Sequence, residues 1–223
     1  MIRFLFTAAL LFSPLCHAAP KGEVEVRFLA ESSPPDLGQV LLANAEARTD
    51  PFDLPVNNLS PAQIPPARLF SVWSVNKNAS LASVTLPEEG KSFIVLLVPS
   101  PKGGYHPIVL RSDDPAFKGG DIRFQNLTNK TVLGFVGTSK FVLAPGLGKV
   151  VTPKGARAEK FYDVGLGVRE AEGDRVLAQT RWPEDALARF YVFFYVHPET
   201  KLVAYRAVDE FVGNAAAALP PGG

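Results

Sequence analysis

The aromatic side chains are the residues of this chain best suited to hold a ligand, because a flat ring can stack on the apolar face of a sugar. Tryptophan and tyrosine also carry a polar group, the indole N–H and the phenol O–H, which can form a hydrogen bond with the ligand. Most of the two tryptophans and five tyrosines lie in strand-like segments, where they fill a core. Tyr105 instead follows the glycine-rich turn 101–104, and Trp182 lies between Arg181 and Pro183. We therefore predict both at the surface, as candidate ligand-binding residues.

Patterns for catalysis and metal binding are weak. The stretch 74–77 (Ser-Val-Asn-Lys) matches Ser-x-x-Lys, but that chemistry needs a helix, and this serine lies in a predicted strand. A blue-copper centre needs a thiolate and two imidazoles. The one cysteine, Cys16, lies in a segment that we expect to be removed, which leaves His106 and His197 without a thiolate partner. We predict no catalytic residue, no cofactor and no metal site.

Three pairs of adjacent carboxylates leave one enzymatic alternative open. They are Asp113-Asp114, Glu88-Glu89 and Glu184-Asp185, all in predicted loops or turns. The two carboxyl groups of a glycosidase stand about 5–9.5 Å apart across a cleft, and one sequence does not say which loops meet. The alternative function is therefore a polysaccharide-acting hydrolase or modifying enzyme with its carboxylates on loops.

The N-terminus has the layout of a secretory signal peptide. Arg3 precedes an apolar run from Phe4 to Leu15, and small residues follow at Ala18 and Ala19. The run is too short to cross about 30 Å of hydrocarbon and is interrupted by Pro14. We predict cleavage after Ala18, export to the periplasm or the medium, and no transmembrane segment in the mature chain.

The charge balance limits the partners of the mature chain. Cleavage would remove Arg3 and leave 22 basic against 22 acidic residues. A neutral chain without basic runs is not suited to nucleic acid, whose phosphates attract clusters of Lys and Arg. With no cysteine left for a disulfide, stability must come from buried hydrophobic side chains, for which this length is ample.

Short alternating segments separated by Gly, Pro, Asn and Asp predict an all-β fold of thirteen or fourteen strands. Two segments, 93–98 and 190–196, are apolar on both faces and should be central strands with both faces covered. The second continues through the turn 197–201 into a hairpin with 202–208. Almost no helix is expected, apart from a candidate turn at 184–188 after Pro183.

The polar, turn-rich stretch 112–120 is the best boundary between two halves. We predict a signal peptide at 1–18, antiparallel β-sandwich (immunoglobulin-like) halves at 19–117 and 118–212, and a disordered tail at 213–223. Whether the halves are independent domains or pack as one unit is left open.

The second half resembles secreted bacterial β-sandwich proteins. A strand at 120–128 ends in Asn126 and Thr128, a hairpin follows at Gly137, and the turn 143–146 (Leu-Ala-Pro-Gly) leads into the next strand. The late Trp182 that precedes Arg189 and Phe190 is similar to uncharacterised secreted families of environmental bacteria. The likeness covers 118–212, rests on turn chemistry, and implies a fold but no activity.

These observations lead to a functional expectation. We expect an exported, non-enzymatic module that binds or assembles with an envelope partner, either a protein or a glycan.

Four Asn-x-Ser/Thr triplets, at Asn58, Asn78, Asn126 and Asn129, are interpreted as turn-forming residues beside strands.

Overall fold

A computed structural model describes residues 24–213 of the chain and confirms an all-β fold. This part of the chain contains fourteen strands and no helix. Their bounds are β1 (Glu25–Ala30), β2 (Val40–Ala43), β3 (Leu69–Ser74), β4 (Ala79–Thr85), β5 (Ser92–Pro99), β6 (Tyr105–Arg111), β7 (Ile122–Asn126), β8 (Val132–Val136), β9 (Ser139–Leu143), β10 (Gly148–Val151), β11 (Phe161–Glu170), β12 (Gly173–Pro183), β13 (Ala188–Val196) and β14 (Val203–Phe211). Within 24–213, no helix is long and apolar enough to span a membrane.

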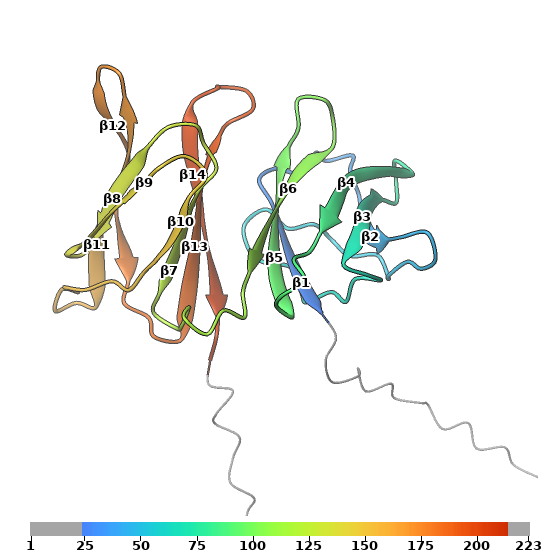
Figure 1. The fold of residues 1–223 in the computed structure, drawn as a ribbon, viewed down its shortest axis with the longest axis horizontal. Helices are drawn as coiled ribbons and strands as arrows, with labels where there is room; N and C mark the ends of the chain where they lie inside the picture. The colour runs from blue at the N-terminus through green and yellow to red at the C-terminus, as the bar shows by residue number, and fades with distance from the viewer. Residues whose placement is uncertain (1–23, 214–223) are drawn as a thin grey trace, which may run out of the picture.

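The strands form four sheets stacked as four layers (Figure 1). Their strand orders are β2-β3-β4, β1-β5-β6, β10-β7-β13-β14 and β12-β11-β8-β9. Strands β1 to β6 make the first two sheets, and β7 to β14 make the other two. Each pair of sheets encloses its own hydrophobic core, and a third cluster lies between the two inner sheets.

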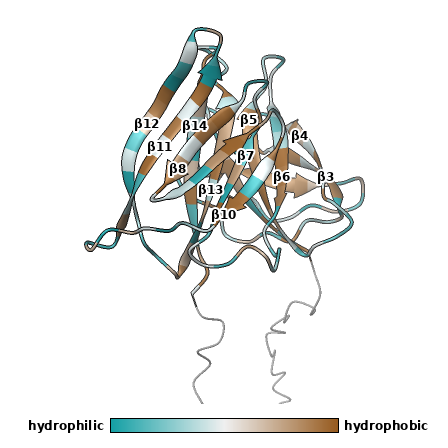
Figure 2. Ribbon diagram, turned by 60° about the vertical axis from the view of Figure 1, so that its left-hand side comes forward, coloured by the Kyte–Doolittle hydropathy of each residue, from teal (hydrophilic) through white to brown (hydrophobic). Residues whose placement is uncertain are grey.

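Strands β5 and β13 are buried on both faces, as their double-sided apolar patterns predict. On β13, Val192 and Phe194 join the core of the second half, while Tyr191 and Phe193 join the cluster between the halves. On β5, Phe93, Val95 and Leu97 point into the first core and Ile94 and Leu96 into the shared cluster. Figure 2 shows hydrophobic colour along these inner strands. Because side chains alternate between the two faces of a strand, successive residues of β5 and of β13 enter different hydrophobic clusters.

Two strand pairings differ from the antiparallel arrangement that we expected. β1 pairs with β5 in parallel, and β7 pairs with β13 in parallel, whereas every other pair of named strands is antiparallel. In each half the first strand therefore lies beside a late strand that forms a hairpin with the last one. A parallel pair needs a long crossover rather than a tight turn, so no local turn signal in the sequence announces it.

The segment after Pro183, where we expected a turn at 184–188, joins β12 to β13 without any helix: the turn is at 186–187, and Ala188 already belongs to β13. Two other predictions concern residues that lie outside the described part of the chain. They are the signal peptide at 1–18 and, except for Gly213, the tail at 213–223.

Polar contacts join the two inner sheets beside the shared apolar cluster. Glu210 of β14, only 8% exposed, accepts hydrogen bonds from Arg189 Nε at 2.6 Å and from the Tyr191 hydroxyl at 2.8 Å. Arg27 of β1 reaches the same carboxylate at 3.5 Å. Arg206 of β14 donates to the carbonyl oxygens of Glu31, at 2.7 Å, and of Val56. The contacts of Arg27 and Arg206 cross between the halves, so each half supplies hydrogen-bonding partners for polar groups of the other.

Candidate functional site

Trp182 and Tyr162 line a pocket of about 150 Å³ at one end of the second half. The two residues are paired across β12 and β11, and both pack against the core of that half. The alternation of β12 sends Arg181 to the opposite face, where it lies over the Phe161 ring and 3.7 Å from Asp163. The indole of Trp182 lies parallel to the Phe190 ring, with centroids 6.5 Å apart and planes 9° apart. Three aromatic side chains therefore form the walls.

Backbone hydrogen bonds hold the rim of this pocket. The Gly120 amide donates to the carbonyl oxygen of Ala188 at 2.7 Å, and the Glu184 amide donates to that of Lys160 at 2.9 Å. A Cβ atom at Gly119 would overlap the backbone oxygen of Ala186, so the segments 119–120 and 185–186 approach as closely as only glycine allows. The pocket is thus built into the fold rather than formed by loose loops.

The side chains that carry a charge in the lining of the pocket are two carboxylates, Glu184 and Asp185, and no lysine or arginine is among its lining residues. Glu184 accepts a hydrogen bond from the Tyr162 hydroxyl at 3.4 Å and pairs with the exposed Lys160 at 3.2 Å. Burial, together with the charge of Glu184, raises the pKa of Tyr162 above its usual value. A phenol is protonated at neutral pH even at its ordinary pKa, and the raised pKa extends this protonated state to higher pH.

A third carboxylate, Asp121, lies in the chain between the lining residues Gly120 and Ile122, is not itself part of the lining, and is only 6% exposed. It accepts hydrogen bonds from the Thr152 hydroxyl at 2.6 Å and the Lys118 amide at 2.9 Å. Among the salt bridges of residues 24–213, none involves Asp121 or Asp185. The pocket therefore combines aromatic walls with negative charge.

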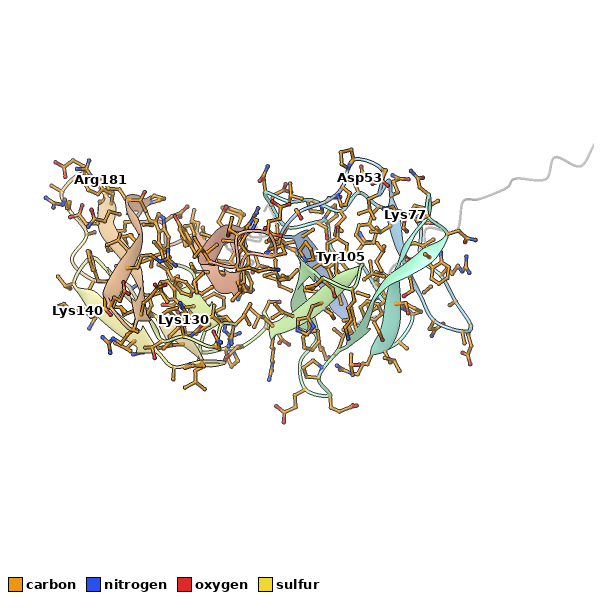
Figure 3. All side chains as sticks on the ribbon, turned by 90° about the horizontal axis from the view of Figure 1, so that it is seen from above. Asp53, Lys77, Tyr105, Lys130, Lys140 and Arg181 are labelled. Carbon is orange, nitrogen blue, oxygen red and sulfur yellow. The ribbon has the colours of Figure 1, made fainter. Side chains whose placement is uncertain are left out.

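The sequence prediction for Tyr105 was wrong as to its exposure. Tyr105 is only 8% exposed, belongs to the core of the first half, and donates a hydrogen bond to the Ser32 carbonyl oxygen at 2.9 Å. The start of β6 can pack closely against β4 because residue 104 is glycine: a Cβ atom there would overlap the Leu81 carbonyl oxygen. In Figure 3, Tyr105 lies in the first half and Arg181, the neighbour of Trp182, at the far end of the second. The two candidates do not form one site.

Trp182 is partly buried, and it keeps its place as a candidate because it lines the pocket. Sequence reasoning named Glu184 and Asp185 only as a loop pair and Tyr162 as core filler, and it missed Phe190 and Thr152. The strand register of β11 and β12 places Tyr162 beside Trp182. Phe190 and Thr152 come from other segments of the chain, and no local pattern in the sequence joins them to these two residues.

A second polar cluster, also missed, lies where the halves meet. The Glu31 side chain is 6% exposed; one of its oxygens accepts a hydrogen bond from the Tyr195 hydroxyl at 3.3 Å, and His197 Nε2 is 3.8 Å from the same oxygen. The other oxygen, Oε2, has no hydrogen-bond partner among the described residues. Across residues 24–213, no group of three or more His, Cys, Asp and Glu side chains is arranged to hold a metal ion.

Comparisons with known proteins assign no family to this site. No protein-family model matches the chain, and no curated protein matches it. What can be said of the site therefore rests on its own geometry.

Proposed function

We propose that this chain is an exported, non-enzymatic binding module of the bacterial cell envelope, and that its ligand site is the pocket beside Trp182. The observation that carries the proposal is the aromatic-walled pocket with carboxylates at its rim. A concave site with apolar walls and a few convergent polar groups is the usual form of a ligand site. The signal-peptide pattern of residues 1–18 and the resemblance of 118–212 to secreted β-sandwich proteins support the compartment.

The site is small, which limits what it holds. About 150 Å³ is the volume that accommodates one benzene molecule, well below the roughly 300–1,000 Å³ of pockets that enclose drug-sized ligands. The pocket therefore takes one compact group, presented by an envelope glycan or by a protein.

The test is capture of envelope glycans and envelope proteins by the mature chain, residues 19–223, in two variants. Trp182→Leu removes an aromatic wall, and Ala186→Phe fills the pocket from its exposed rim without removing a contact. Ala171→Phe, in the exposed turn between β11 and β12, is the matched control. We expect both pocket variants to lose a ligand that the control keeps. Capture that is unchanged in Ala186→Phe would contradict the proposal.

A second candidate, an assembly component, is favoured by the outer face of the β12-β11-β8-β9 sheet. Phe135, Val142 and Val176 are 39%, 61% and 61% exposed there, and Gly165 and Gly167 floor an apolar hollow of about 160 Å³ between Phe135 and Val176. Contiguous exposed apolar surface is typical of protein contact sites. A protein partner that binds the wild type in a stoichiometric complex, is lost in Val176→Lys and is retained in Ala186→Phe would support this candidate instead.

The hydrolase alternative shares the Trp182 pocket through Glu184 and Asp185. New reducing ends released from a glycan by the wild type but not by Glu184→Gln would support it. We expect no such release, because the Glu184 carboxylate is already engaged by Lys160 and Tyr162.

A further inference from the structure

We propose that the pocket beside Trp182 binds an organic cation, a quaternary or methylated ammonium group such as that of choline or betaine. This inference rests on the proposed function, and it names the chemical class of the ligand. Three features of the pocket lead to it: the aromatic walls, the sign of the charge, and the volume.

The walls have the composition of a cation–π site. Indole, phenol and phenyl rings, from Trp182, Tyr162 and Phe190, line the same hollow, and two prolines, Pro153 and Pro183, add further apolar surface. The negative face of an aromatic ring attracts a cation, with tryptophan the strongest partner, and cages of such rings are the usual receptors for quaternary ammonium groups. An ammonium that carries methyl groups also gains from losing water contact with those methyls.

The charge at the rim has the matching sign. Glu184 and Asp185 line the pocket, and the buried Asp121 is hydrogen-bonded to the lining residue Thr152. Lys160 Nζ lies 3.2 Å from Glu184 Oε2 and offsets that charge, although 78% of its side chain is exposed, whereas none of the salt bridges of residues 24–213 involves Asp185 or Asp121. Arg181 is on the other face of β12, held by Asp163. An anion would meet these carboxylates without a basic side chain in the lining, whereas a cation is attracted by them.

The volume excludes a large ligand. A hollow of about 150 Å³ holds a group the size of benzene, and a trimethylammonium head is of that order, while a whole oligosaccharide is not. The rest of the ligand must therefore lie outside the pocket. The same headgroup occurs in free solutes and in lipids, so both sources are tested.

The experiment is calorimetric titration of the whole mature chain with choline, and with the neutral carbon isostere in which a tert-butyl group replaces the trimethylammonium group. We expect saturable binding of choline and about tenfold weaker binding of the isostere, because only the cation gains from the rings and carboxylates. Equal affinity for both compounds would overturn the proposal, since the pocket would then be merely apolar.

Variants assign the binding to this pocket. Asp185→Asn and Glu184→Gln keep the shape of the pocket, and each should weaken choline binding several-fold, while Glu172→Gln, in the exposed turn between β11 and β12, should not change it. Ala186→Phe should abolish it. Choline binding that is unaffected by Ala186→Phe, or by loss of both carboxylates, would contradict the assignment even if Trp182→Leu fails to fold.

The two proposals fail in different ways. Retention of an envelope glycan or protein that Ala186→Phe blocks, without any binding of choline, would overturn the cation class and leave the binding module intact. If the chain neither retains an envelope ligand nor binds choline, the binding-module proposal and the cation proposal are both overturned. Vesicles with choline headgroups, compared with vesicles of phosphatidylglycerol, distinguish a lipid source from a free solute: binding to the first in a manner blocked by Ala186→Phe assigns the lipid, and binding of choline alone assigns the solute.

Discussion

At the scale of single residues, we expect the buried tyrosines to make the stability of the molecule sensitive to alkali. Tyr191 is fully buried and donates its hydrogen bond to Glu210. Burial first, and then the charge of Glu210, raise the pKa of Tyr191 far above its ordinary value of about 10. Burial raises the pKa of Tyr195 and Tyr105 as well. These phenols stay protonated in the folded chain at pH values where they ionise in the unfolded chain.

We therefore predict a loss of stability above pH 10. A phenol whose pKa is raised on folding contributes its full stabilisation below the unfolded pKa and loses it as the pH rises toward the folded pKa. Tyr191→Phe removes one such group, so its free energy of unfolding should fall less steeply above pH 10, by up to about 1.4 kcal/mol per pH unit. At pH 8 the variant should be less stable, by about 1.5–3 kcal/mol, because Glu210 loses a donor.

Denaturant unfolding of both proteins from pH 8 to pH 12 measures this difference. Parallel slopes for wild type and variant would contradict the role given to Tyr191.

Residue types alone could not distinguish Trp182 from Tyr105. Both are aromatic and stand beside turn-forming residues, yet Tyr105 points into a core and Trp182 lines a pocket. The difference depends on what covers each strand face, which is set by pairings between segments far apart in the chain. For the same reason no sequence signal joined Glu31 to Tyr195, Arg206 and His197.

At the scale of elements, one buried asparagine organises the end of β7. Asn126 is completely buried, and its amide group donates to the carbonyl oxygens of Lys130 at 2.8 Å, Leu143 at 3.2 Å and Ala144 at 3.0 Å. Its carbonyl oxygen accepts from the backbone amide and the hydroxyl of Thr128. One side chain thereby joins the end of β7, the turn before β8 and the end of β9.

Asn126→Ala should destabilise the chain by roughly 3 kcal/mol, because it leaves several buried backbone carbonyl groups without their donor. Asn129 lies in the same turn with its side chain exposed, so Asn129→Ala should change the stability by less than about 0.5 kcal/mol. Thermal and denaturant unfolding compare the two. An equal loss of stability in the two variants would show that the stabilisation comes from the turn as a whole and not from the buried amide of Asn126.

The elements themselves could largely be predicted from the sequence, because the period of two and the turn residues are local signals. The double-sided patterns of β5 and β13 also indicated correctly that both strands are covered on both faces. The interpretation of Asn126 and Thr128 as turn-forming residues agrees with their hydrogen bonds. The parallel pairing of β1 with β5 and of β7 with β13 could not be predicted, since it depends on long crossovers without a turn signature.

At the scale of the whole molecule, the shared cluster between the inner sheets links the stability of the two halves. Phe193 of β13 is fully buried there with Ile94 and Leu96 of β5. Ion pairs and hydrogen bonds of Arg27, Arg206 and Tyr195 cross the same boundary. An interface with these contacts predicts that the halves unfold together.

Calorimetry should therefore record one cooperative transition, with equal calorimetric and van't Hoff enthalpies. Phe193→Ala should lower the free energy of unfolding by about 3–5 kcal/mol, and Phe211→Ala, a residue 72% exposed on β14, by much less. Two separate transitions in the wild type would contradict the linked unfolding and indicate independent domains.

The fluorescence of Trp182 shows whether the pocket beside this residue is the ligand site. The chain has two tryptophans, so Trp73→Phe leaves Trp182 as the sole indole and makes its emission a report on the pocket. We predict that choline, or the envelope fraction that the chain retains, changes this emission saturably and that Ala186→Phe abolishes the change. A retained ligand that leaves the emission of Trp182 unaltered, or alters it equally in Ala186→Phe, would show that the ligand binds elsewhere on the chain.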